Sequence, residues 1–188
     1  VGFLSICLTV WAWISDNPRW VKWLATSVLA AVIFQGILGG LRVIWVDLDL
    51  AVVHACFAQA FFCLAALFAC ITSKWWITAE TKQPGIASNR LIKLAFFSVA
   101  VIYLQLVIGA CMRHFNAGLA IPDFPTSYGH VLPPTNLNAI NDYRVLKLNL
   151  PPVAMWQIWL HFAHRVGALI VTISLLSLIG HVIYHNRR

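Results

Sequence analysis

The chain contains 188 residues, of which 61% are hydrophobic and only 10% are charged, and its mean hydropathy is +0.80. Soluble domains carry about 25% charged residues, so this composition excludes an ordinary soluble protein and predicts a membrane protein in contact with the lipid bilayer. The net charge of +7 does not indicate a nucleic-acid partner, because the positions of the basic residues between apolar segments explain it better.

An apolar run opens the chain and lasts from Val1 only to Ile14. It lacks the charged start and the cleavage site of a signal peptide, so we expect the end of a transmembrane helix whose beginning is missing, and hence a fragment. Four longer spans follow, each exceeding the ~20 residues needed to cross a bilayer. The pattern predicts an all-α fold, a polytopic transmembrane helix bundle. The spans are 19–46, 48–72, 90–114 and 153–184.

The connections between the spans predict their orientation. Short turns lie at 16–19 and 46–49, residues 73–89 are polar, and 115–152 form a long loop with six of the eight prolines. Lysine and arginine accumulate on one side, which should be cytoplasmic, so we expect 73–89 and the C-terminus inside and 115–152 outside. The inner side holds Arg19, Lys22, Lys74, Lys82, Arg90, Lys93, Arg187 and Arg188, and the outer side holds Arg42, Arg113, Arg144 and Lys147.

The five cysteines do not predict a disulfide framework, because all of them lie in apolar segments and the long loop has none. Cys56, Cys63 and Cys70 recur every seven residues on one helix face. At about 100° per residue that face points away from His54, so we interpret these cysteines as small packing residues.

Three histidines lie inside apolar spans near their outer ends: His54, His161 and His164. An ionisable side chain in a span costs about 2.5 kcal/mol or more, so it indicates a functional site by default. Imidazole is a common axial ligand of haem iron, although a lone intramembrane histidine can also serve as an interhelical hydrogen-bonding residue. His161 and His164 share one face and cannot bind both sides of a haem, so one is expected to be the ligand and the other its neighbour.

The helix faces around these histidines are suited to a flat ligand. Porphyrin is an apolar ring with two carboxylates, and it needs an imidazole, a slot and cationic partners. Arg165, next to His164, could pair with a propionate. Small residues and two aromatic rings share the face of His54, and small residues share that of His164: Ala51, Ala58, Phe61, Ala65 and Phe68, and then Gly167, Ala168 and Val171.

A short motif occurs twice, each time before an outer connection and a histidine-bearing span. It reads Gln, three residues, Gly, and Arg about one turn later; its members are Gln35, Gly39 and Arg42, and then Gln105, Gly109 and Arg113. The glycines let a helix or a flat ligand approach closely, and simple helix packing explains them equally well. The arginine heads lie where a ligand's carboxylates could reach the interface, and His114 lies beside Arg113. Duplicated halves are common in membrane proteins.

In this combination and order, the chain resembles the haem A synthase family over essentially its whole length. The stretches that carry the resemblance are 108–114, 118–125, 161–168 and the Gln-x-x-x-Gly-Gly span before His54. The resemblance implies eight transmembrane helices in two similar four-helix halves, each holding one haem between two histidines. Residues 1–72 would belong to the first half, 73–89 to a cytoplasmic linker, and 90–188 to the second half.

By resemblance, His54 faces the substrate haem O and His164 ligates a haem B cofactor, both through haem iron. The reaction oxidises a methyl group of haem O to a formyl group, which gives haem A for cytochrome oxidase. The implied partners are haem O, haem A, haem O synthase and oxidase assembly factors. The implied location is a bacterial plasma membrane or the mitochondrial inner membrane.

Three departures from the family pattern matter. The Glu-x-x-His-Arg motif and one further histidine are missing, so the expected catalytic glutamate would lie before Val1 and this chain alone should be inactive. Ile121 and Ser127 stand where some members carry a cysteine pair, so no thiol chemistry is expected. His161 stands at the position that corresponds to the missing glutamate. It is either a residue that supports the iron ligand without binding iron or an additional iron ligand.

Two other functions fit the same histidines. A di-haem b-type membrane cytochrome would carry electrons to or from quinone, and a haem-handling subunit would serve oxidase assembly. The loop 118–125 favours the synthase, but only through the resemblance.

The charge bias leads to a testable topology. A reporter enzyme that works only in the cytoplasm should be active when it is fused within 73–89, because basic residues flank that segment. A reporter that works only outside the cytoplasm should be active when it is fused within 115–152. The opposite pattern would contradict the assignment.

Overall fold

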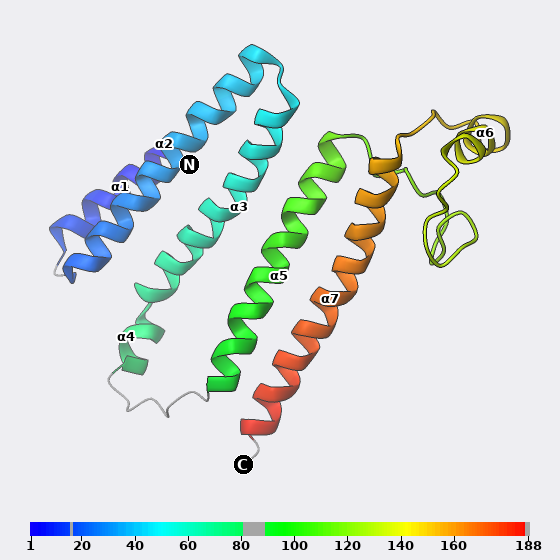
Figure 1. Cartoon of the computed structure of the whole chain (residues 1–188). Helices are drawn as coiled ribbons and strands as arrows, with labels where there is room; N and C mark the ends of the chain where they lie inside the picture. Colours follow the sequence, from blue (N-terminus) through cyan, green and yellow to red (C-terminus); the bar gives the residue numbers. More distant parts are fainter. Residues whose placement is uncertain (16, 81–88, 187–188) are drawn as a thin grey trace. The chain divides into compact units, whose positions relative to one another are not determined.

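The computed structural model describes residues 1–15, 17–80 and 89–186, and Figure 1 shows that they are built from helices. Asp16, Lys82, Arg187 and Arg188, used in the predictions above, lie outside the described residues. The all-helical class is confirmed, and four helices are long and apolar enough to cross a membrane. The helices are α1 (Gly2–Ile14), α2 (Arg19–Trp45), α3 (Leu48–Ile71), α4 (Lys74–Glu80), α5 (Asn89–His114), α6 (Leu137–Leu148) and α7 (Met155–Asn186).

The chain divides into two compact units, Val1–Ala87 and Ser88–Arg188. In the first, α2 packs against α1 on one side and α3 on the other. Small residues make the α1–α2 contact close, so that Thr9 donates a hydrogen bond to the backbone oxygen of Ala25 at 3.1 Å. The buried cluster consists of Ala12, Val21, Ala25, Val28 and Phe68.

The acidic turn between α2 and α3 has a structural cause. Val46 ends α2 in the left-handed conformation with φ 50°, and Asp47 follows as the N-cap of α3. The Asp47 carboxylate accepts hydrogen bonds from the backbone of Asp49 at 2.8 Å and of Leu50 at 3.0 Å. These bonds satisfy donors that the first turn of a helix leaves unpaired, so the turn and its two aspartates terminate one span and start the next.

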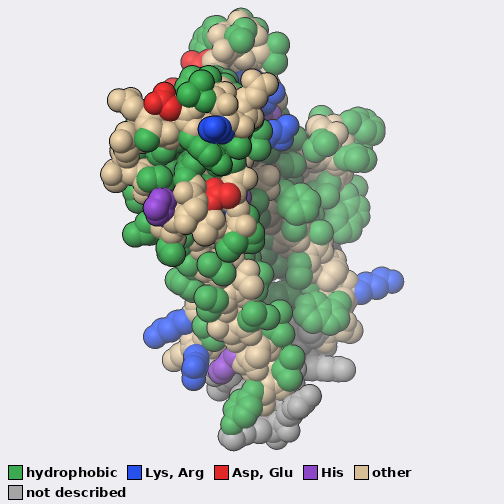
Figure 2. All heavy atoms as spheres, turned by 90° about the vertical axis from the view of Figure 1, so that its right-hand side faces the viewer, with side chains coloured by type: hydrophobic (Ala, Val, Ile, Leu, Met, Phe, Trp, Pro, Cys, Tyr) green, Lys and Arg blue, Asp and Glu red, His purple; other side chains and the backbone are tan. Residues whose placement is uncertain are grey.

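In the second unit, α5 and α7 lie side by side over their length, as Figure 1 shows. Ser98 and Ser174 join them through a buried hydroxyl–hydroxyl hydrogen bond of 2.7 Å. Most of the large apolar side chains on these helices point outward, and Figure 2 shows hydrophobic atoms covering much of the surface between the charged ends. Such a surface is suited to lipid rather than to water.

Residues 115–154, called the outer module after their predicted side of the membrane, contain a helix that the sequence analysis does not predict. The module contains α6, which Asn136 caps at the N-terminus through a 3.2 Å bond to Ala139, and which ends at Asn149 with φ 52°. Ile121, Ile140 and Val153 belong to its buried cluster, together with Ile158 of α7. The apolar cluster therefore fixes the module on the outer end of α7.

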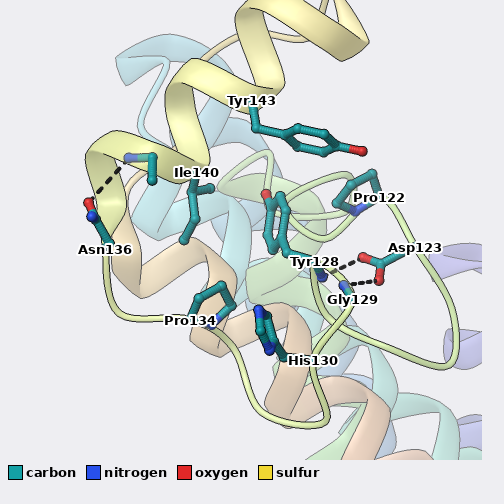
Figure 3. A pocket seen from close by; sticks show the side chains of 10 residues that line it. Pro122, Asp123, Tyr128, Gly129, His130, Pro134, Asn136, Ile140 and Tyr143 are labelled. Carbon is teal, nitrogen blue, oxygen red and sulfur yellow. Dashed lines mark hydrogen bonds between the residues drawn. The ribbon is translucent and has the colours of Figure 1, made fainter.

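One carboxylate organises the tip of this module. Asp123 accepts hydrogen bonds from the hydroxyl of Thr126 and from the backbone N–H groups of Tyr128, at 2.7 Å, and Gly129, at 2.9 Å. Partial burial raises the pKa of Asp123, but these hydrogen bonds outweigh burial and hold it below its usual value. Figure 3 shows the two backbone bonds at the edge of a pocket of about 540 Å³ in the module.

Candidate functional site

His54 lies against the backbone of α2 at Gly39. A Cβ atom at Gly39 would come within 3.1 Å of His54 Cε1, a distance tighter than most real contacts of this kind. The glycine therefore allows the imidazole to approach the helix. The close approach predicted for this motif is thus made by the histidine ring itself.

Gln35, one turn before Gly39, holds the backbone at the histidine. Its Nε2 donates a 2.9 Å hydrogen bond to the carbonyl oxygen of His54, bridging α2 and α3. That bond leaves Gln35 Oε1 and His54 Nδ1 buried, and neither has a hydrogen-bond partner among the described residues. A buried donor and a buried acceptor thus remain available in the same small region.

The second unit repeats the arrangement with the same three residue types at other positions. A Cβ atom at Gly109 of α5 would lie 3.2 Å from Cε1 of His164 on α7. Gln105 Nε2 donates to the carbonyl oxygen of His164 at 2.8 Å and lies 3.0 Å from its Nδ1. The two occurrences of the sequence motif therefore place the same three groups together in each helix pair.

Gly167 adds a requirement that is specific to the second unit. A Cβ atom there would lie only 2.1 Å from Gln105 Oε1, so any larger residue would force the end of the glutamine side chain to move. The corresponding residue in the first unit, three after His54, is Phe57, whose ring packs edge-to-face on Phe34 with centroids 4.8 Å apart. The glutamine contact is thus kept in both units, while the packing beside it differs.

His161 serves a different neighbour from His164, although both lie on α7. It is buried, and its Nδ1 accepts a 3.2 Å hydrogen bond from the backbone of Ile121 in the outer module. Arg165 Nε lies 3.3 Å from its Nε2. His161 therefore contacts the outer module, while His164 contacts α5.

Arg165 also joins α7 to the outer module. Its guanidinium donates to the carbonyl oxygens of Thr126 at 2.9 Å and Ile121 at 3.2 Å, and it lies 5.6 Å from the ring centroid of Phe124. The two carbonyl contacts use two of its five donors and leave the others for a ligand.

The remaining predicted residues lie at helix ends. Arg42 is in the last turn of α2, and Arg113 and His114 are in the last turn of α5. Arg113 lines an open cavity at that end. None of the three makes a hydrogen bond with other residues in 1–15, 17–80 or 89–186, so their donors are available to a ligand.

Each helix pair therefore offers one imidazole rather than a cluster of metal ligands. In the part of the chain that the structure describes, no group of three or more His, Cys, Asp or Glu side chains could hold a metal ion. None of the five cysteines, all of which lie among the described residues, forms a disulfide. One imidazole beside a helix face without large side chains could bind the metal of a planar complex. Such a complex supplies the other ligands of the metal itself.

Two features were not predicted from the sequence. The repeat contains the glutamines, but it does not predict their bond to the histidine backbone; their fixed spacing from the glycines is the available signal. Arg144 was counted only as an outer-side charge, yet it is 1% exposed and donates to four oxygens in the outer module. No sequence pattern indicated that burial.

A family model described as "Cytochrome oxidase assembly protein", COX15-CtaA, matches residues 1–188. The chain belongs to this family. It is therefore an integral membrane protein, in agreement with its four apolar helices. No solved structure matches the chain.

Curated relatives of this COX15-CtaA family chain carry the name heme A synthase. The protein of Geobacillus kaustophilus is 24% identical over 100% of the chain and 53% of its own length. That of Shouchella clausii is 26% identical over 96% and 62%, and that of Lysinibacillus sphaericus 29% over 100% and 57%. The chain thus spans about half the length of the curated relatives it matches.

The contact between Gly167 and Gln105 leads to a stability prediction. Gly167→Ala should displace Gln105 and break its bond to His164, lowering the free energy of unfolding by about 1–3 kcal/mol. Thermal unfolding of the full-length protein in detergent measures this loss. Gly180→Ala on the same helix is the matched control, because nothing lies within 4 Å of its Cβ position. Equal melting temperatures for the two variants would contradict the contact.

Proposed function

We propose that this protein is a haem A synthase, a membrane oxidoreductase that converts a methyl group of haem O into a formyl group and so supplies haem A to cytochrome oxidase. The observation that carries the proposal is the repeated placement of one imidazole against a glycine in each helix pair. Relatives with that name match along the whole chain, which supports the assignment.

The residues fit a porphyrin in both units. A porphyrin would be held by an imidazole nitrogen, and Gly39 and Gly109 let each imidazole lie close to the backbone of the neighbouring helix. When bound, the haem iron supplies the redox chemistry, and the protein supplies binding, orientation and electrostatics. We assign His54 to the substrate haem O and His164 to a resident haem B.

The glutamines orient the two histidines. A histidine that ligates a metal through one nitrogen donates a hydrogen bond from the other, which sets its tautomer and ring orientation. Among the described residues, Gln35 Oε1 and His54 Nδ1 are both buried without a partner, so Gln35 Oε1 would be the acceptor for a proton on Nδ1. That pairing would leave Nε2 as the nitrogen for iron. At His164 the amide nitrogen of Gln105, not its oxygen, lies 3.0 Å from Nδ1, so Gln105 would have to turn Oε1 toward the ring to accept the same hydrogen bond.

The cations at the outer helix ends would bind the propionates. Arg42 and His114 offer donors at the interface, and Arg165 offers those not used by the outer module, whereas Arg113 lines a separate cavity. His161 accepts a hydrogen bond from the backbone of Ile121. It would therefore hold the outer module on α7 rather than bind iron as an additional ligand. The catalytic glutamate of the family motif has no counterpart in this sequence, so no catalytic residue is assigned.

The arrangement in the membrane follows the charges. Residues 1–72 and 90–188 would belong to two four-helix halves joined by a cytoplasmic segment 73–89, with the C-terminus inside and the outer module outside. The membrane would be a bacterial plasma membrane or the mitochondrial inner membrane, where haem O synthase and oxidase assembly factors are the expected partners.

Haem analysis of the full-length protein tests the activity. Acid-acetone extraction and mass spectrometry should find haem B together with haem O or haem A, because both porphyrins would occupy the protein during turnover. A di-haem b-type cytochrome, the alternative, should yield haem B alone. Haem B alone, with no conversion in cells supplied with haem O, would refute the synthase.

Single substitutions test the separate roles of the two histidines. His164→Ala should remove the bound haem B, lowering its stoichiometry about tenfold. His54→Ala should keep haem B near the wild-type level and block formation of haem A. Pyridine haemochrome spectra and product analysis measure the two effects. Equal loss of haem B in both variants would show that the assignment is wrong.

A further inference from the structure

An open cavity of about 620 Å³ lies between the outer end of α5 and the start of α7, under the outer module. Arg113 and Asn116 line it from the α5 side, Leu119 and Arg144 from the module, and Gln157 from α7. None of the three intramembrane histidines lines it. The cavity is therefore a feature separate from the imidazole sites.

The guanidinium of Arg144 is buried at this cavity with donors to spare. Nε donates to the carbonyl oxygen of Pro151 at 2.9 Å, and Nη1 donates to the oxygens of Leu119 and Ala120 at 2.8 and 3.2 Å. Nη1 also lies 3.1 Å from the hydroxyl of Tyr128. Nη2 has no hydrogen bond to any residue in 1–15, 17–80 or 89–186, so its two donors are left for a ligand in the cavity.

The positive charge of Arg144 is not neutralised by the protein. In the described parts of the chain, no Asp or Glu carboxylate lies within ion-pair distance of it, and carbonyl oxygens supply only partial charge. Arg144 is 1% exposed, and an uncompensated charge at such a position is costly. An anion entering the cavity would compensate it.

Arg113 supplies a second cation at the same cavity. It is in the last turn of α5, it is exposed, and it makes no hydrogen bond with other described residues. Two guanidinium groups that share a cavity form a site suited to an oxyanion such as a phosphate. Asn116, also exposed in the lining, adds an amide donor.

The position of the cavity identifies the source of the oxyanion. Trp156 at the start of α7 is 52% exposed and packs edge-to-face on Phe115, with centroids 5.7 Å apart. Exposed tryptophan at the end of a span is typical of the membrane–water interface, where lipid headgroups lie. Leu119, 68% exposed in the cavity wall, offers apolar surface to an acyl chain.

We propose that this cavity binds the phosphate of an anionic phospholipid from the outer leaflet, held by Arg144 and Arg113. Phosphatidylglycerol, with net negative charge, should bind, whereas the choline cation of phosphatidylcholine is repelled by the same two arginines. The lipid would fix the outer module on the ends of α5 and α7. This inference does not depend on the haem chemistry proposed above.

Native mass spectrometry of the full-length protein in detergent tests the site. Wild type titrated with phosphatidylglycerol should retain one lipid, and Arg113→Gln should bind it about fivefold more weakly, since a charge-assisted contact is lost. Lys147→Gln is the matched control: it removes one exposed cation on the same side that does not line the cavity, and its binding should equal wild type. Arg144→Gln should abolish binding; Arg113→Gln keeps the test valid if that variant does not fold.

Four outcomes would overturn the proposal. The first is equal binding by Arg113→Gln and Lys147→Gln, and the second is equal retention of phosphatidylcholine by wild type. The third is binding of inorganic phosphate as tight as that of the lipid, which would make the source a free anion. In the fourth, Arg113→Gln loses haem but keeps phosphatidylglycerol, which would assign the cavity to a haem carboxylate.

Discussion

The contact between an imidazole ring and a bare stretch of helix backbone is the constraint on which the rest of each helix pair depends. Lipid provides little hydrophobic force to hold two helices together, so small residues and hydrogen bonds must set their separation. At Gly39 and Gly109 a Cβ atom would lie 3.1 and 3.2 Å from the histidine ring. A larger residue would displace the ring, and with it the nitrogen that the site offers.

The glutamine bond converts this contact into a fixed register. Gln35 and Gln105 reach across to the backbone carbonyl of the histidine rather than only to its side chain. A backbone bond sets how far one helix is shifted along the other, and the glycine one turn later sets how closely they approach. Two positions of one helix, one turn apart, therefore set where the imidazole lies along that helix and how close it comes to the backbone.

The sequence predicted the parts of the structure that follow from periodicity and burial cost. The four spans, the intramembrane histidines and the repeated motif could all be seen in it, because apolar length and misplaced polar residues are local signals. The helix α6 was missed, since it mixes apolar and polar residues over only 12 positions and its limits depend on Asn136 and Asn149. The burial of Arg144 was also missed, because its carbonyl partners come from distant turns that only the folded module assembles.

The glutamine and the carbonyl oxygen it binds are 19 residues apart in the first unit and 59 residues apart in the second. The longer separation accommodates the entire outer module, yet the register of the helix pair is unchanged. The connection between the two helices is therefore a place where a long segment can be inserted without loss of the glutamine–histidine bond. The inserted module can therefore carry a binding surface of its own while the bond that sets the register of the helix pair is retained.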